Sequence, residues 1–299
     1  MLNPILWQQA TALWQEAKSR EETLSREKLA EILNVSEQHA RQIIYSLKYR
    51  DIIAMKPETF EVGSETVLMC GDNHIPYHDR LLMELFIDYG KSVKPDTIVL
   101  GGDVIDFYKL SSFCKDPRKK SIKSEIAETR EFLARLRNEF PNTRIIYKEG
   151  NHEKRLMTYL FNNSPELVEV LDNAIPTMLH LKDYDIEYKV LPFQFGKLWV
   201  LHGHEKPGGS YNPEYITNVM WKFIHDNFIV FHFHRMQDKI FKSITDNSWT
   251  GIACAMMAGI HDLDYAILNN WTQGFVHLNF NNDGTFQFQK RNFVNGKLY

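Results

Sequence analysis

The spacing of apolar residues changes character near residue 63. Before that point, apolar positions recur at helical spacing, as at Ala10, Leu13 and Trp14. After it, short apolar runs alternate with longer amphipathic ones, a pattern typical of the strands and helices of an α/β fold. The pattern therefore predicts two domains, a small helical one over residues 1–62 and an α/β one over residues 63–299.

The helical segment has the features of a helix-turn-helix. Ser25 and Ser36 each stand where a serine side chain caps a helix. The helix after Ser36 would present outward Gln38, Arg41, Gln42, Tyr45, Lys48 and Arg50. Because the first 60 residues hold eight Lys or Arg and eight Asp or Glu, the segment has no basic bias. Two hypotheses follow: a DNA-docking helix-turn-helix with a small wing at residues 52–55, or a helical bundle used for packing or oligomerisation.

The α/β part is predicted from short runs of apolar residues. Five runs predict strands at residues 66–70, 97–100, 144–147, 197–201 and 228–231. Two longer runs predict amphipathic helices at residues 81–89 and 121–140. Near the C-terminus, residues 274–278 and 285–288 flank Asn281-Asn282-Asp283-Gly284, a sequence that favours a tight turn, so we expect a β-hairpin there.

Composition narrows the class of protein. Of the 299 residues, 43% are hydrophobic, which is too many for a disordered chain, and the net charge of −3 excludes a generally basic nucleic-acid binder. No apolar run reaches the roughly 18 residues of a membrane span, and the first residues lack the features of a signal peptide. Three cysteines without a CxxC pair favour reduced thiols. We therefore expect a cytoplasmic protein.

Side chains that can bind metals follow each of the five predicted strands. In chain order they are Gly71-Asp72-Asn73-His74, Gly101-Gly102-Asp103-Val104-Ile105-Asp106, Gly150-Asn151-His152-Glu153, His202-Gly203-His204 and His232-Phe233-His234. Because ligands in α/β sheets collect outside the carboxyl ends of strands, these loops are expected to converge on one site. A mixture of carboxylate, amide and imidazole groups favours Mn, Fe or Zn over Ca or Mg alone.

The ordered motifs D-x-H, G-D-x-x-D, G-N-H-E, H-G and H-x-H resemble the calcineurin-like metallophosphoesterase superfamily over residues 64–280. The contexts around Phe107 and Arg155 are similar to those of phage and prophage members. The resemblance implies a four-layer α/β/β/α sandwich. One departure is Phe231, which replaces the glycine of the family's G-H-x-H motif, so a slightly altered loop is expected there.

The resemblance also implies a centre of two divalent metals. One metal would be held by Asp72, His74 and His234, the other by Asn151, His202 and His232, and Asp103 would bridge both. Two such ions about 3.5–4 Å apart lower the pKa of a shared water and neutralise charge on the reacting phosphorus. The family pattern suggests Mn, with Zn, Fe and Ni as alternatives.

The same resemblance assigns roles in catalysis. His152 resembles the family's general acid for the leaving oxygen, and Asp106 would orient its ring. Candidate substrate contacts are Arg155, His204, Lys119 and Lys120. The two lysines belong to a basic cluster over residues 115–123, close behind the second motif, where they could meet a phosphate backbone.

Three functions are then open. The first is a metal-dependent phosphodiesterase or nuclease that acts on nucleic acid or nucleotides. The second is a phosphomonoesterase that acts on a small molecule or a phosphoprotein. The third is a DNA-binding protein whose metal site is vestigial, and the complete set of seven predicted ligands argues against it.

Overall fold

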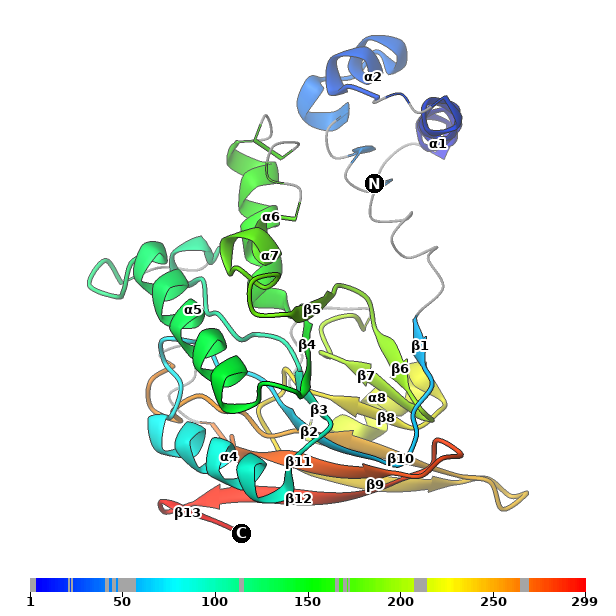
Figure 1. The fold of residues 1–299 in the computed structure, drawn as a ribbon. Coiled ribbons are helices and arrows are strands. Elements are labelled where there is room, and N and C mark those ends of the chain that lie inside the picture. The colour runs from blue at the N-terminus through cyan, green and yellow to red at the C-terminus, as the bar shows by residue number, and fades with distance from the viewer. Residues whose placement is uncertain are drawn as a thin grey trace. The chain divides into compact units, whose positions relative to one another are not determined.

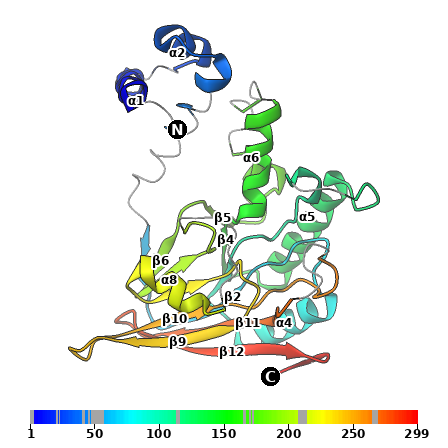
Figure 2. The ribbon, with the colours of Figure 1, turned by 180° about the vertical axis from the view of Figure 1, so that it is seen from behind.

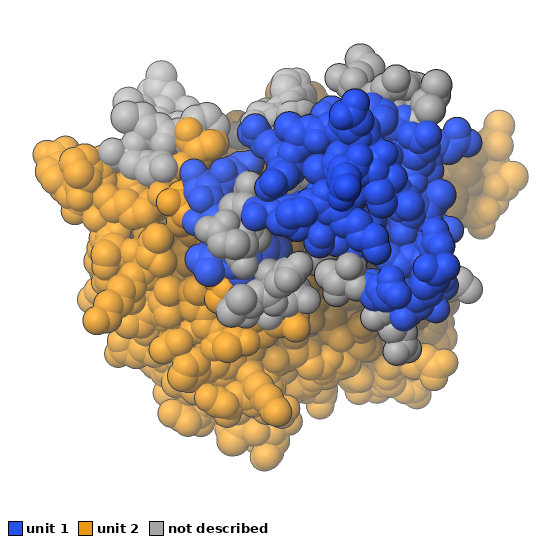
Figure 3. All heavy atoms as spheres, turned by 90° about the horizontal axis from the view of Figure 1, so that it is seen from above, with its two compact units in different colours: residues 1–56, 160–168 blue, residues 57–159, 169–299 orange. Residues whose placement is uncertain are grey.

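The computed structural model describes residues 4–20, 22, 24–40, 43–44, 47, 58–112, 116–164, 167–168, 171, 173–206, 214–263 and 269–299. The chain divides into two compact units (Figure 3). The first consists of Met1–Lys56 with Leu160–Val168, and the second of Pro57–Tyr159 with Glu169–Tyr299. The described part of the chain contains no helix that is both long and apolar enough to cross a membrane.

The first unit is helical where it is described. The helices α1 (Pro4–Ser19) and α2 (Arg26–Leu33) form as their apolar spacing predicts, and the Ser25 side chain accepts a hydrogen bond from the Lys28 amide. Ser36 likewise caps a further helical segment at residues 37–40. The buried core of this unit contains Ala10, Leu29, Leu33, Ala40, Ile43 and Leu47. Arg41, Lys48, Arg50 and the expected wing at residues 52–55 lie outside the described residues.

The second unit contains two β-sheets. The first has the strand order β1-β6-β7-β8-β10-β9, formed by Thr59–Phe60, Phe193–Phe195, Leu198–Leu201, Phe228–Val230, Ser248–Ala253 and Gln237–Lys242. The second has the order β13-β12-β11-β2-β3-β4-β5, formed by Lys297–Leu298, Phe286–Val294, Gln273–Phe280, Glu65–Cys70, Thr97–Leu100, Arg144–Lys148 and Ile186–Lys189. Strand β1, which the sequence boundary placed in the helical domain, pairs with β6 and so belongs to this unit.

The two sheets pack face to face, because alternate residues of each strand point into one shared core. In β2, Val67 and Met69 lie in this core with Phe195, Val200 and Ile252 of the other sheet. The predicted strands and the C-terminal hairpin are confirmed. The short strands β1, β5 and β6 and the hairpin of β9 and β10 were not predicted; β9 is an edge strand whose exposed residues follow no apolar alternation.

Helices cover the outer face of each sheet, which completes the predicted four-layer α/β/β/α arrangement (Figures 1 and 2). On the seven-stranded sheet, α4 (Arg80–Val93) buries Leu82, Met83, Phe86 and Ile87, and α5 (Ile122–Glu139) lies beside α4. On the six-stranded sheet, α8 (Ile216–Ile224) packs on β9 and β10. The remaining described helices of this part of the chain are η1 (Tyr108–Leu110), α6 (Asn151–Asn163) and α7 (Ala174–Met178).

Candidate metal centre

The carboxyl ends of five parallel strands meet where the two sheets adjoin. Strands β2, β3 and β4 run parallel in one sheet, and β7 and β8 run parallel in the other. Each of the predicted metal ligands lies just beyond the end of one of these strands, Asn151 as the first residue of α6 and the others in loops. Five of them have a left-handed backbone, with φ from 48° to 70°: Asp72, His74, Asp103, His232 and His234. Such a backbone costs a non-glycine residue about 1–2 kcal/mol, and strain of this kind is typical of functional loops.

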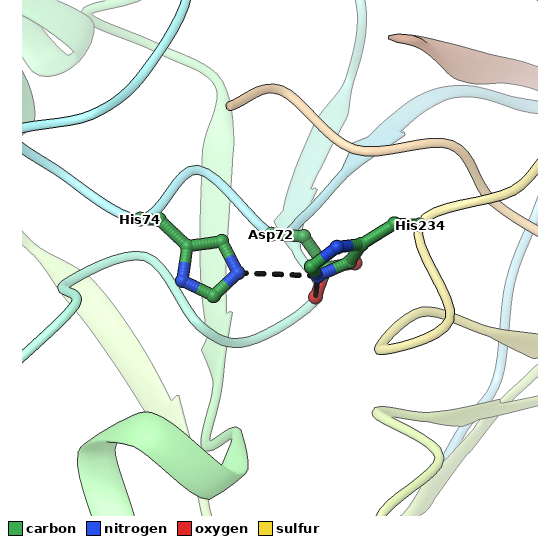
Figure 4. A group of neighbouring side chains, drawn as sticks. All are labelled: Asp72, His74 and His234. Carbon is green, nitrogen blue, oxygen red and sulfur yellow. Dashed lines mark hydrogen bonds and ion pairs between the residues drawn. The ribbon is translucent and has the colours of Figure 1, made fainter. Parts of the chain in front are cut away.

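Asp72, His74 and His234 form a first group of potential ligands. Their ligand atoms lie within 4.8 Å of one another. Nε2 of His74 is 3.2 Å from Nε2 of His234, which is itself 3.4 Å from Oδ1 of Asp72 (Figure 4). Two nitrogens bound to the same ion at about 2.1 Å stand roughly 3.0–3.4 Å apart, so the spacing of the two rings fits a shared metal.

Asp103, His202 and His232 form a second group, again within 4.8 Å. Oδ1 of Asn151 is 3.1 Å from Nε2 of His202, so the predicted amide ligand lies at the same place. Oδ2 of Asp103 is 3.3 Å from Nε2 of His202 and 4.0 Å from Nε2 of His74. The Asp103 carboxylate therefore lies between the two groups, as a bridging ligand must.

Two of the histidines are held so that Nε2 can bind a metal. Nδ1 of His202 lies 2.9 Å from the carbonyl oxygen of Gly101, which can only accept a hydrogen bond. Nδ1 of His74 lies 2.8 Å from Oδ1 of Asp106. Burial alone would raise the pKa of Asp106, but His152 and His74 outweigh it and hold that pKa low, so Asp106 is an ionised acceptor. With a metal bound, both rings would keep their proton on Nδ1 and direct the Nε2 lone pair into the site.

His152 and Asp106 meet at the edge of this centre. Nδ1 of His152 is 2.7 Å from the Asp106 carbonyl oxygen and 3.0 Å from its Oδ1. Arg155 donates one hydrogen bond to the same carbonyl and another, of 2.8 Å, to Nε2 of His152. Burial lowers the pKa of His152, but the charges of Asp103 and Asp106 outweigh burial and raise it. Asp106 thus contacts both His74 and His152, where the sequence suggested a role only toward His152.

The other predicted substrate contacts lie in different environments. His204 is partly buried beside Glu205, and the loss of hydration lowers the pKa of its ring to about 3. Lys120 is bound to the carboxylate of Glu128 at 2.6 Å. Lys119 lies 4.8 Å above the ring of Tyr77, which follows His74 in the same loop. It also lies 5.8 Å from the ring of Tyr108, two residues beyond Asp106, so its charge stands beside the loops of the centre.

Glu153 is a site residue to which the sequence assigned no role. Its fully buried carboxylate accepts hydrogen bonds from the backbone amides of Asp103 (3.0 Å), Val104 (2.8 Å) and Gly150 (2.8 Å). The hydroxyl of Tyr147 donates a further bond of 2.7 Å to it. Glu153 therefore ties the Asp103 loop to the Asn151 loop. The one feature of the sequence that could have identified Glu153 is its place as the last residue of the G-N-H-E motif.

Phe231 has a packing role that explains its departure from the family motif. Its ring is fully buried, and it lies against Gly71 and Gly101, the first residues after β2 and β3. A Cβ atom on Gly71 would lie 2.7 Å from this ring, and one on Gly101 would overlap it. The two glycines leave room for the aromatic ring, which packs directly under the metal-binding loops.

We expect Gly101→Ala to destabilise the protein by about 1–3 kcal/mol, the usual cost of forcing an extra methyl group into a packed core. The measurement is urea unfolding followed by circular dichroism. Gly63→Ala is the matched control, because a Cβ there meets only Asn282 at an ordinary 3.8 Å. Equal stabilities for the two variants would contradict the packing described for Phe231.

Comparison with known proteins agrees with the arrangement of the site. The family model for calcineurin-like phosphoesterases matches residues 65–267. The Gene 54 protein of Mycobacterium phage L5 is 30% identical over 185 residues, which cover 58% of this chain and 70% of that protein. The Gene 54 protein of Mycobacterium phage D29 is 31% identical over 186 residues, with the same coverage.

Solved structures are similar at lower identity. Vacuolar protein sorting 29 from Cryptosporidium parvum matches 80% of this chain and 96% of its own at 15% identity, with a TM-score of 0.43. A dimetal phosphatase from Danio rerio matches 78% of this chain and 98% of its own at 10% identity, with a TM-score of 0.37. Since the family model covers every loop of the site, the chain belongs to the calcineurin-like phosphoesterases, as its five motifs predicted.

Proposed function

We propose that this protein is a two-metal phosphodiesterase that acts on nucleic acid or nucleotides. The observation that carries the proposal is the place of Asp103, whose carboxylate lies between two groups of metal-binding side chains. Only two of the seven proposed ligands are carboxylates. Two divalent cations would therefore leave the centre with a net positive charge, which suits a phosphoester.

Asp72, His74 and His234 would hold one metal, Asn151, His202 and His232 the other, and Asp103 both. Mn is the proposed ion, with Zn, Fe or Ni as alternatives, because a set of imidazole, carboxylate and amide ligands suits these ions better than Mg alone. When bound, the pair would supply an activated water and neutralise charge on the phosphoryl group.

The chain's own side chains would bind the ester and handle the leaving group. We infer that Arg155 holds a phosphate oxygen through its guanidinium group, since this group already reaches Nε2 of His152 at the edge of the centre. His152 would give a proton to the leaving oxygen, and Asp106 would keep the imidazole oriented through Nδ1.

Nucleic acid is the proposed substrate class. Lys119 supports it, because its ammonium group lies over Tyr77 and Tyr108 beside the metal-binding loops, where a neighbouring phosphate of a polymer could bind. The two capped helical segments of the first unit agree with a helix-turn-helix. The phage relatives fit action in the cytoplasm of a host cell.

One panel of assays tests these proposals. Purified full-length protein with Mn²⁺ should hydrolyse bis-p-nitrophenyl phosphate and single- or double-stranded DNA faster than p-nitrophenyl phosphate. A preference for p-nitrophenyl phosphate would favour the phosphomonoesterase alternative. Turnover of none of these esters, together with DNA binding that weakens as salt rises, would favour the non-catalytic alternative.

The DNA-docking role of the first unit needs substitutions rather than a deletion, because residues 160–168 cluster with the N-terminal helices. Replacing Arg41, Lys48 and Arg50 together with alanine should weaken DNA binding in a gel-shift titration and reduce its dependence on salt. Hydrolysis of the small aryl diester should not change, because every proposed ligand lies beyond these residues. If the intact protein binds DNA without any dependence on salt, the docking hypothesis is wrong.

A further inference from the structure

Lys148 is a lysine with no exposed surface, at the carboxyl end of β4. Its ammonium group lies 2.7 Å from the carbonyl oxygen of Glu149 and 2.9 Å from that of Val190. The third contact is an ion pair of 3.0 Å with Oε1 of Glu205. All three N–H bonds of the ammonium group can therefore be used inside the protein, which fixes the position of the side chain.

Glu205 uses both of its carboxylate oxygens on the loop that follows β7. Oε1 accepts a hydrogen bond of 3.1 Å from the backbone amide of His202, and Oε2 accepts one of 2.6 Å from that of Gly203. Gly203 has a φ of +120°, a conformation that side chains rarely adopt. Glu205 therefore fixes the backbone amides of a proposed metal ligand, His202, and of the glycine that follows it.

The ion pair joins the two sheets at the metal centre. Lys148 belongs to the seven-stranded sheet and stands three residues before Asn151, while Glu205 follows a strand of the six-stranded sheet and stands three residues after His202. Asn151 and His202 are 3.1 Å apart at their ligand atoms and would bind the same metal. A change in the Lys148–Glu205 contact would therefore move one ligand relative to the other.

The ion pair is fully buried at Lys148 and 17% exposed at Glu205, and an ion pair that is largely removed from water is a poor source of stability. Removing one partner of such a pair is strongly destabilising, but replacing both partners by neutral groups is often without cost, because the ions lose their hydration when they are buried. The pair therefore needs a reason other than stability. Groups that orient metal ligands provide one, since their loss typically weakens metal binding 10- to 100-fold.

We propose that Lys148 and Glu205 are a positioning pair that sets the distance between Asn151 and His202, and thereby the affinity for the metal held by Asn151, His202 and His232. The inference rests on the metal centre proposed above. It assigns the pair no contact with substrate. It predicts that the affinity for the other metal, held by Asp72, His74 and His234, does not depend on the pair.

The test compares Mn²⁺ binding with folding stability in the full-length protein. Mn²⁺ alone is titrated by calorimetry into the wild type, Lys148→Met, Glu205→Gln and the double variant, and each is unfolded in urea without metal. The single variants should lose stability and bind one of two Mn²⁺ ions roughly 10- to 100-fold more weakly. The double variant should recover most of the stability but none of the affinity.

Two further variants keep the test decisive. Glu205→Asp retains the charge but shortens the side chain, so it should lose affinity for one ion even if the double variant does not fold. The double variant Arg144→Met/Glu187→Gln is the matched control, because it removes a half-exposed ion pair of 2.6 Å at the other end of β4. Its two Mn²⁺ dissociation constants should equal those of the wild type.

The outcomes separate this inference from the proposed function. If the wild type binds fewer than two Mn²⁺ ions, the proposed centre itself is wrong. If the wild type binds two ions and the double variant or Glu205→Asp binds both within threefold of wild-type affinity, only the positioning role is wrong. Recovery of affinity in parallel with stability in the double variant would likewise overturn it, since the pair would then be structural.

Discussion

Asp103→Asn is expected to lower kcat/KM for bis-p-nitrophenyl phosphate by roughly 10²–10⁴-fold, because a metal pair supplies several kcal/mol of transition-state stabilisation. Asparagine has nearly the shape of aspartate but lacks its charge. Oδ2 of Asp103 lies 3.3 Å from Nε2 of His202 and 4.0 Å from Nε2 of His74, so this single change removes a negative charge that faces both groups. The variant should also lose at least one bound Mn²⁺, measured by metal analysis after gel filtration.

The fold of the variant should remain intact, which circular dichroism and urea unfolding would check. Oδ1 of Asp103 accepts a hydrogen bond of 2.8 Å from the His152 amide, and the carbonyl oxygen of asparagine can accept the same bond. Asp238→Asn is a suitable control, because Asp238 pairs with Lys290 on the surface of the same unit. Full occupancy by two ions and an unchanged rate in Asp103→Asn would exclude the bridging role.

The positions of the proposed ligands along the chain follow from local rules. A buried parallel strand ends where its apolar run ends, so the residues that follow β2, β3, β4, β7 and β8 could be located without any structure. Since the carboxyl ends of parallel strands share one edge, Asp72, Asp103 and Asn151 could be expected together. The helix starts at Ser25 and Ser36 were equally accessible, because a capping side chain acts within three residues.

What the sequence could not supply were the partners of buried groups. Glu153 bonds to amides 48 to 50 residues earlier in the chain, and Lys148 pairs with an acid from the other sheet. An alternation of apolar and polar residues predicts which side chains are buried, but it does not predict which residues they contact. Phe231 is a further example, since its substitution for glycine is understood only beside Gly71 and Gly101.

The geometry of His152 makes a second strong prediction, about the dependence of the rate on the leaving group. The Asp106 carbonyl oxygen can only accept, so Nδ1 of His152 carries a proton, and Nε2 accepts from Arg155 at 2.8 Å. Nε2 lies 3.7 Å from Oδ2 of Asp103 and so belongs to the edge of the centre. Proton delivery from Nε2 requires two changes: Arg155 must turn from the imidazole to the bound phosphate, and the freed Nε2 must take up a proton from solvent. The carboxylates of Asp103 and Asp106, which raise the pKa of His152, favour this second protonation.

His152→Ala should therefore slow esters with poor leaving groups, such as dinucleotides, by about 10²–10⁴-fold, the usual contribution of a general acid. Activated aryl diesters should lose much less, because a nitrophenolate departs without a proton. The measurement is a plot of log kcat/KM against the pKa of the leaving group, which should be steeper for the variant than for the wild type. The exposed His261 provides the control substitution, His261→Ala, which should leave both the slope and the rates unchanged. Parallel lines for His152→Ala and the wild type, displaced by a constant factor, would instead mean that His152 stabilises charge common to all the esters and donates no proton.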